Sequence, residues 1–140
     1  MQMSNELRQW HSVMQKPIVI TEYGADAIAG LHQYPPFTFT EEYQAEVMAK
    51  NHAAFDQARR EGILHGEMIW NFADFMTKQE ITRVLGNNKG VFTRQRQPKM
   101  SAHMLRARYC WLARKQWNAT MTRTHDQSST ASAMSTCFNN

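Results

Sequence analysis

The sequence predicts an α/β protein in which helices alternate with short, parallel strands. Helical and strand patterns follow one another along the chain in the order helix, strand, helix, strand, helix, which is typical of a parallel sheet with helical crossovers. The first strand segment is a short β-branched run, as expected of a strand that is buried on both faces. The loops that follow the strands, residues 24–40 and 73–97, are much longer than those that precede them.

The first part of this pattern is one helix and one strand. We expect a helix over residues 4–14, with Ser4 or Asn5 as its N-cap. The run Ile18-Val19-Ile20-Thr21 then predicts a strand, since β-branched residues favour strands. The run stops abruptly at Glu22-Tyr23-Gly24, so an acidic side chain is expected directly at the strand end.

The second part repeats the pattern. Thr40 occupies the N-cap position of a helix that Gly62 closes. Residues 65–70 predict the second strand. A third helix is expected from about Pro98, a residue favoured in the first helical turn, to about Ala113.

The last part of the chain differs in composition from the rest. After Trp117 the sequence turns to Thr, Ser, Asn and Gln, which is typical of a disordered segment. We therefore expect a folded part over residues 1–117 and a disordered tail over residues 118–140. Two strands can neither close a (β/α)₈ barrel nor cover their own edges, so the folded part is expected to be an incomplete barrel.

Composition and charge exclude several classes of partner. Apolar residues make up 42% of the chain and charged residues 20%, so a folded protein is expected. The net charge of +4 is spread over separate clusters without a stacking motif, so no nucleic-acid partner is expected. No segment is apolar enough to span a membrane, and the N-terminal residues have no signal-peptide core. The histidines lack metal-ligand spacing, so neither a metal nor a cofactor is expected.

Glu22 is the leading candidate for a catalytic residue. In α/β barrels, catalytic groups lie at the carboxyl ends of strands, which is where the sequence puts this carboxylate. Retaining glycosidases use one such carboxylate as a nucleophile, with a second carboxylic acid roughly 5–5.5 Å away to protonate the leaving oxygen. Taken by position alone, a glutamate such as Glu22 is more often a surface residue at a strand end.

Two further segments favour a sugar site. The second strand ends in an aromatic and amide cluster at residues 70–75, and sugar sites combine aromatic faces with hydrogen-bonding side chains. A glycine-bounded loop follows with Arg83, Asn87 and Lys89, which could bind a carboxylate through charge-assisted hydrogen bonds. Each segment taken singly also has an ordinary structural interpretation, as core aromatics or as a turn. Asp74 could bond loop backbone near the site.

Together these segments resemble the β-glucuronidases of glycoside hydrolase family 2, over residues 16–113. The resemblance rests on several blocks in a fixed order: ITEYGA at 20–25, AGLHQ at 29–33 followed by Pro35 and Pro36, TEEYQ at 40–44, GEMIWNFADF at 66–75 and RVLGNNKGVFTR at 83–94. It implies that the chain is the C-terminal part of a TIM-barrel catalytic domain.

The resemblance also implies roles for individual residues. Glu22 would be the nucleophile and Tyr23 its hydrogen-bonding neighbour, and Trp70 would shape the sugar-binding wall. Asn87 and Lys89, helped by Arg83, would bind the carboxylate of a β-D-glucuronide. This last pair makes a relative that acts on neutral galactosides or mannosides less favoured. The family further implies a homotetramer in a lysosomal or secretory location.

The acid/base glutamate of the family has no counterpart in this sequence. In the family it follows an asparagine at the end of an earlier strand, but the Asn5-Glu6 pair opens a helix only 16 residues before Glu22. The 140 residues by themselves are therefore expected to be inactive. The alternative is a non-catalytic truncated isoform or an interaction fragment of the same family.

Overall fold

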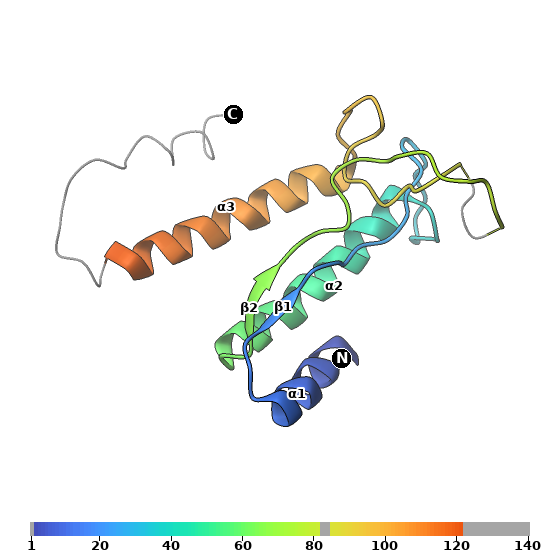
Figure 1. Ribbon diagram of the computed structural model, residues 1–140. Coiled ribbons are helices and arrows are strands. Elements are labelled where there is room, and N and C mark those ends of the chain that lie inside the picture. Colours follow the sequence, from blue (N-terminus) through green and yellow to red (C-terminus); the bar gives the residue numbers. More distant parts are fainter. Residues whose placement is uncertain (1, 82–84, 122–140) are drawn as a thin grey trace. The chain divides into compact units, whose positions relative to one another are not determined.

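The computed structural model describes residues 2–81 and 85–121. It contains five elements: α1 (Gln2–Met14), β1 (Ile18–Ile20), α2 (Glu41–Arg60), β2 (Leu64–Glu67) and α3 (Met100–Met121) (Figure 1). The chain divides into two compact units, Met1–Ser101 and Ala102–Asn140. Both strands, the two earlier helices and the first two residues of α3 belong to the first unit.

The two strands pair in parallel, as the sequence predicts. The register places Ile18, Val19 and Ile20 against Leu64, Gly66 and Glu67, with an irregularity after the first pair. The crossover between the strands contains α2, which lies beside them in Figure 1. This is the parallel βαβ arrangement, and two paired strands make it only a part of a barrel, as predicted.

The boundaries of α2 also agree with the sequence. Thr40 is its N-cap, with an extended backbone (φ −77°, ψ 154°) and a side-chain oxygen that accepts the Tyr43 N–H at 3.2 Å. Gly62 follows the helix with a φ of +73°, a left-handed conformation that glycine adopts without steric cost.

The boundaries of the other two helices differ from the prediction. The expected N-cap at Ser4 or Asn5 is wrong, because α1 begins at Gln2 and Ser4 is buried inside the helix. The expected end of the third helix at Ala113 is also wrong, since α3 continues to Met121. The extension has a simple cause: no Gly or Pro interrupts residues 114–121. The rest of the expected disordered tail lies outside the described residues.

The core of the first unit forms along one face of α2. Met48, Phe55 and Ala58 are buried there, and the burial of their apolar surface stabilises the fold. Leu7 from α1 and Leu64 from β2 are buried as well, and α2 contacts both of these elements.

An apolar surface beside β1 is left exposed by the rest of the first unit. Trp10, Met14 and Val19 are 61%, 58% and 49% exposed, and they line an apolar hollow of about 360 Å³ with their neighbours. An incomplete barrel is expected to expose such a face, because the neighbouring strand and helix of a whole barrel would cover it.

Two carboxylates at the start of α2 hold the long loop after β1. Glu41 accepts the Gly30 N–H at 2.7 Å. Glu42 accepts the Gln33 N–H at 3.2 Å and lies 2.7 Å from His32 Nδ1. Negative charge is also favourable at a helix N-terminus, so the same groups support both the loop and the helix.

The His32–Glu42 pair predicts a pH dependence. Its hydrogen bond raises the pKa of His32 above 6.5 and lowers the pKa of Glu42 below 4.5. The histidine contribution to stability is present below pH 6.5 and is lost as the pH rises through the raised pKa. The glutamate contribution is present above pH 4.5 and is lost as the pH falls through the lowered pKa. Folding is therefore favoured most between these two values.

An NMR titration of the His32 ring tests this linkage. In Glu42→Gln the His32 pKa should fall toward 6.5, because the neutral amide no longer stabilises the imidazolium. Glu46→Gln, which removes an exposed carboxylate paired with Lys50, is the matched control and should leave the His32 titration unchanged. An unshifted His32 titration in Glu42→Gln would contradict the pairing.

Candidate active site

The candidate site lies where the two strands end. Glu22 follows β1 by two residues, and its side chain is exposed. A cavity of about 200 Å³ is lined by Glu22, Tyr23, Gly24, Trp70 and Lys89. Four of the six residues that the sequence selects for the site are therefore brought together around one hollow.

Backbone pairing beyond the strands holds this arrangement. The Met68 N–H donates to the Ile20 carbonyl at 2.8 Å, and the Trp70 N–H donates to the Tyr23 carbonyl at 2.9 Å. The two acceptors, Ile20 and Tyr23, are therefore three residues apart along the chain, whereas the two donors, Met68 and Trp70, are two residues apart. The extra residue makes a bulge beside Glu22, and such bulges redirect side chains at active sites.

Gly24 allows the two strand ends to approach closely. Its φ is +144°, and a Cβ atom added there would lie 2.6 Å from the Trp70 carbonyl oxygen. A side chain at this position would push the backbone after β1 away from the backbone after β2. Glycine is therefore required by the contact itself as well as by the backbone conformation.

Tyr23 is oriented toward α2. The residue is 6% exposed, and its hydroxyl lies 2.9 Å from His52 Nε2. Its ring packs edge-on against Phe55, with centroids 5.0 Å apart. Tyr23 thus lines the cavity while its hydroxyl is engaged with a buried histidine, an arrangement that the sequence analysis did not foresee.

Trp70 forms the aromatic wall of the cavity. Its side chain is 37% exposed and meets the Phe75 ring edge-on, with centroids 6.3 Å apart. The Trp70–Asn71 peptide bond is cis. An exposed indole beside a carboxylate can pack against the apolar C–H face of a sugar ring.

Lys89 reaches the cavity from the glycine-bounded loop. Its carbonyl accepts the Asn71 N–H at 3.1 Å, and the Asn71 carbonyl accepts the Val91 N–H at 3.1 Å. Asn87 Oδ1 accepts the Lys89 N–H at 3.0 Å. Asn87 is 2% exposed and does not line the cavity. Its side-chain oxygen instead supports the turn that carries Lys89. Arg83 lies outside the described residues.

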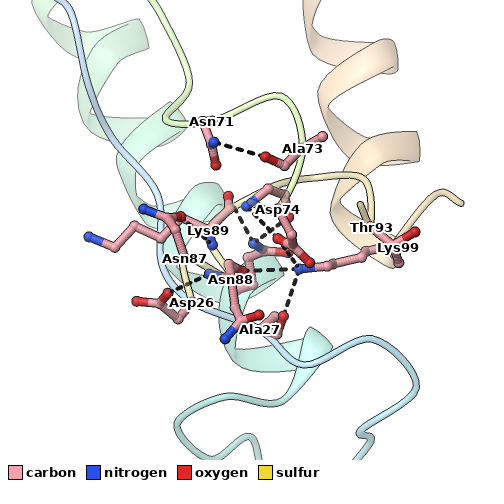
Figure 2. Close-up of polar contacts among 12 residues, drawn as sticks. Asp26, Ala27, Asn71, Ala73, Asp74, Asn87, Asn88, Lys89, Thr93 and Lys99 are labelled. Atoms are coloured by element: carbon pink, nitrogen blue, oxygen red, sulfur yellow. Dashed lines mark hydrogen bonds and ion pairs between the residues drawn. The ribbon is translucent and has the colours of Figure 1, made fainter. Parts of the chain in front are cut away.

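A buried cation, Lys99, lies behind this loop, and no sequence pattern predicted its burial. Lys99 is 1% exposed, and its Nζ donates to the carbonyls of Ala27 and Asn88 and to Asp74 Oδ1 at 2.6, 3.0 and 2.9 Å (Figure 2). In Figure 2 the Lys89 side chain extends away from this cluster, on the side opposite Lys99. One feature of the sequence could have indicated this burial. A lysine just before a helix N-terminus is electrostatically unfavourable, so its presence there suggests that it interacts with groups elsewhere in the fold.

Asp74 and Gln44 complete the support of the loop. Asp74 Oδ1 also accepts the Gly90 N–H at 2.9 Å, as the sequence analysis anticipated for a bond to loop backbone. Burial raises the pKa of the Asp74 carboxyl group above 3.8, and the Lys99 ammonium opposes part of that rise. Gln44 Nε2 donates to the carbonyls of Ala25 and Gly90 at 2.8 and 3.2 Å.

The described residues contain no helix that is long and apolar enough to cross a membrane. Within the same part of the chain, no group of three or more His, Cys, Asp or Glu residues is arranged to bind a metal ion. Glu67, the one acidic residue of β2, forms an ion pair with Arg59, and its side chain is 1% exposed.

The parallel βαβ arrangement is that of a part of an α/β barrel, and comparison with known proteins agrees. The family model described as glycosyl hydrolases family 2, TIM barrel domain, matches residues 1–114. The chain therefore belongs to this family, which confirms the resemblance found in the sequence.

Within this family, the chain is similar to β-glucuronidases. The chain is 55% identical over 113 residues to a β-glucuronidase of Pongo abelii, which covers 81% of this chain and 17% of the relative. Among solved structures, a β-D-glucuronidase of Dictyoglomus thermophilum is similar with 56% identity and a TM-score of 0.73, over 77% of this chain and 18% of that one.

A second similar structure is that of a bound complex. The β-glucuronidase of Ruminococcus gnavus in complex with uronic deoxynojirimycin matches with 44% identity and a TM-score of 0.68, over 74% of this chain and 18% of that one. The chain thus spans about a sixth of the length of the curated relatives that it matches.

The close approach at Gly24 gives a test of the site's construction. Gly24→Ala should lower the free energy of unfolding by about 1–3 kcal/mol, because the added methyl group meets the Trp70 carbonyl. Gly30→Ala is the matched control: it also has a positive φ, but nothing lies within 4 Å of its added Cβ. Urea unfolding of both variants measures the difference, and equal losses would mean that the strand ends do not approach as described.

Proposed function

We propose that this chain supplies the nucleophile and the carboxylate-binding part of a β-glucuronidase active site. The observation that carries the proposal is that Glu22, Trp70 and Lys89 line a single cavity at the carboxyl ends of the two strands. A carboxylate, an aromatic face and a cation are the groups that a glycosidase specific for an acidic sugar requires. The β-glucuronidase relatives support the same assignment.

In this proposal Glu22 attacks the anomeric carbon of a β-D-glucuronide. The C–O bond to the aglycone breaks as the bond to the Glu22 oxygen forms, which gives a covalent glycosyl-enzyme intermediate. Water then attacks the same carbon and releases glucuronic acid with retained configuration. The residues that line the cavity include no second carboxylate, so the proton for the leaving oxygen must come from another part of the barrel.

Lys89 would bind the C6 carboxylate of the substrate. Two negative groups, the Glu22 carboxylate and the sugar carboxylate, repel each other in a partly desolvated cavity, and a nearby ammonium group offsets that repulsion. Asn87 would assist through the turn that it forms with the Lys89 N–H. Arg83 and Tyr23 would support the residues that bind the substrate. For the whole protein, the proposal includes a homotetramer in a lysosomal or secretory location.

The Lys89 assignment is tested by binding of two inhibitors that differ in one group. In Lys89→Met, affinity for uronic isofagomine should fall at least about tenfold, because a charge-assisted hydrogen bond is lost. Affinity for the neutral isofagomine should stay the same, and Lys50→Met, on an exposed face of α2, should change neither value. Equal losses for both inhibitors in Lys89→Met, measured by calorimetry, would exclude a carboxylate-binding role.

A second prediction concerns turnover by the 140-residue chain. We expect no measurable hydrolysis of an aryl glucuronide, because a missing general acid costs roughly 10²–10⁴-fold and a partial barrel positions the sugar poorly. A fluorescent release assay with Glu22→Gln as the blank measures this. Robust release that disappears in Glu22→Gln would show that the nucleophile is correct and the expected inactivity is wrong.

The exposed apolar face favours a second candidate function, that of an interaction fragment. Trp10, Met14 and Val19 present a surface of the kind that a neighbouring part of a barrel covers. Under this alternative the chain would bind a family member without reacting with its substrate. Size-exclusion chromatography with a full-length β-glucuronidase distinguishes the two, since stable co-elution without catalysis would favour the interaction fragment.

A further inference from the structure

The buried ammonium group of Lys99 satisfies three acceptors from three separate segments. Ala27 belongs to the loop after β1, Asp74 to the loop after β2, and Asn88 to the glycine-bounded loop. An ammonium group has three N–H donors, and all three are used here. Lys99 therefore joins the three segments that surround the candidate site.

The bonds around Lys99 continue into the backbone of the loop that carries Lys89. The Asn88 N–H donates to Asp26 Oδ1 at 3.1 Å, and the Asn88 carbonyl accepts the Ala27 N–H at 3.0 Å as well as Lys99 Nζ. On the other side of Lys89, the Gly90 N–H donates to Asp74 Oδ1. Both residues adjacent to Lys89 are thus tied to the Lys99 cluster.

The contact at Gly90 leaves little room for the loop to move. A Cβ atom added at Gly90 would clash with the Asp74 nitrogen and the Ala73 carbonyl carbon. The loop backbone therefore lies directly against the segment after β2. The ion pair between the buried Lys99 ammonium and the partly buried Asp74 carboxylate fixes the two segments in one register, since a shift would leave a charge unpaired.

We propose that Lys99 is a positioning residue that sets the place of the Lys89 ammonium relative to Glu22, and so determines the preference for an acidic sugar. This inference rests on the proposed function. Lys99 does not touch the substrate, because it lies behind the loop and is buried. Its charge is balanced locally by Asp74, so it acts through geometry and not through its field at the sugar.

A positioning role accounts for a lysine just before the N-terminus of α3, where a positive charge is electrostatically unfavourable. A methionine of similar length could fill the same space but could donate no hydrogen bonds to the Ala27 and Asn88 carbonyls. Those carbonyls would then lose a buried donor, and the residues flanking Lys89 would lose their common anchor. Binding groups that are displaced by about 1 Å can lose about 10²-fold in effectiveness.

The test compares Lys99→Met, the double variant Asp74→Asn/Lys99→Met and the control Lys50→Met in the purified chain. The double variant leaves no unpaired buried charge, so it keeps the test open if Lys99→Met fails to fold. Amide hydrogen exchange of Asn88 and Gly90 is measured by NMR. Exchange at both amides should be at least about tenfold faster in the double variant, and unchanged in Lys50→Met, because the anchor of the loop is gone.

Inhibitor binding then links the loop to specificity. In the double variant, affinity for uronic isofagomine should fall about tenfold or more while affinity for neutral isofagomine stays within about twofold. Unchanged exchange and unchanged uronate affinity would overturn the inference, as would equal losses for both inhibitors. If the unmodified chain shows no preference for the uronate, the proposed function fails, and the exchange rates by themselves decide whether Lys99 anchors the loop.

Discussion

Parallel pairing of β1 with β2 is the interaction on which the rest of the candidate site depends. Because parallel strands place their carboxyl ends at one edge, Glu22 and Trp70 line the same cavity although they are 48 residues apart in the sequence. Two features of the backbone set how closely the two strand ends approach each other. The bulge after Ile20 inserts one residue beside Glu22, and Gly24 lets the two backbones come close. The backbone conformation at the strand ends therefore places Glu22 and Trp70, the acidic and aromatic walls of the cavity.

The third wall depends on a different kind of constraint. Lys89 comes from an irregular loop, which has no strand register to fix it. The Lys99 ammonium, Asp74 and Gln44 supply the hydrogen bonds that regular structure would otherwise provide. Buried charge is costly unless it is paired and hydrogen-bonded, so this cluster tolerates few alternative arrangements. A rigid loop is what a specific carboxylate site needs.

The sequence was sufficient where local chemistry decides the structure. A β-branched run followed by an acid predicted where Glu22 lies, and Thr40 and Gly62 marked the ends of α2 through ordinary capping. It was insufficient where the outcome depends on distant partners. The hydroxyl of Tyr23 meets His52, 29 residues away, and Lys99 is buried because its acceptors lie up to 72 residues away. Ser4 was mistaken for a cap because its burial against the fold has no local signal.

We propose that Glu22 is the group that attacks the anomeric carbon. A 2-deoxy-2-fluoro-glucuronyl fluoride tests it most directly, since fluoride leaves without a general acid and the fluorinated intermediate hydrolyses slowly. Peptide mass spectrometry after incubation should find the glycosyl group on the peptide that contains Glu22, and on no peptide of Glu22→Gln. A label on another carboxylate, or equal labelling of Glu22→Gln, would show that Glu22 is not the nucleophile.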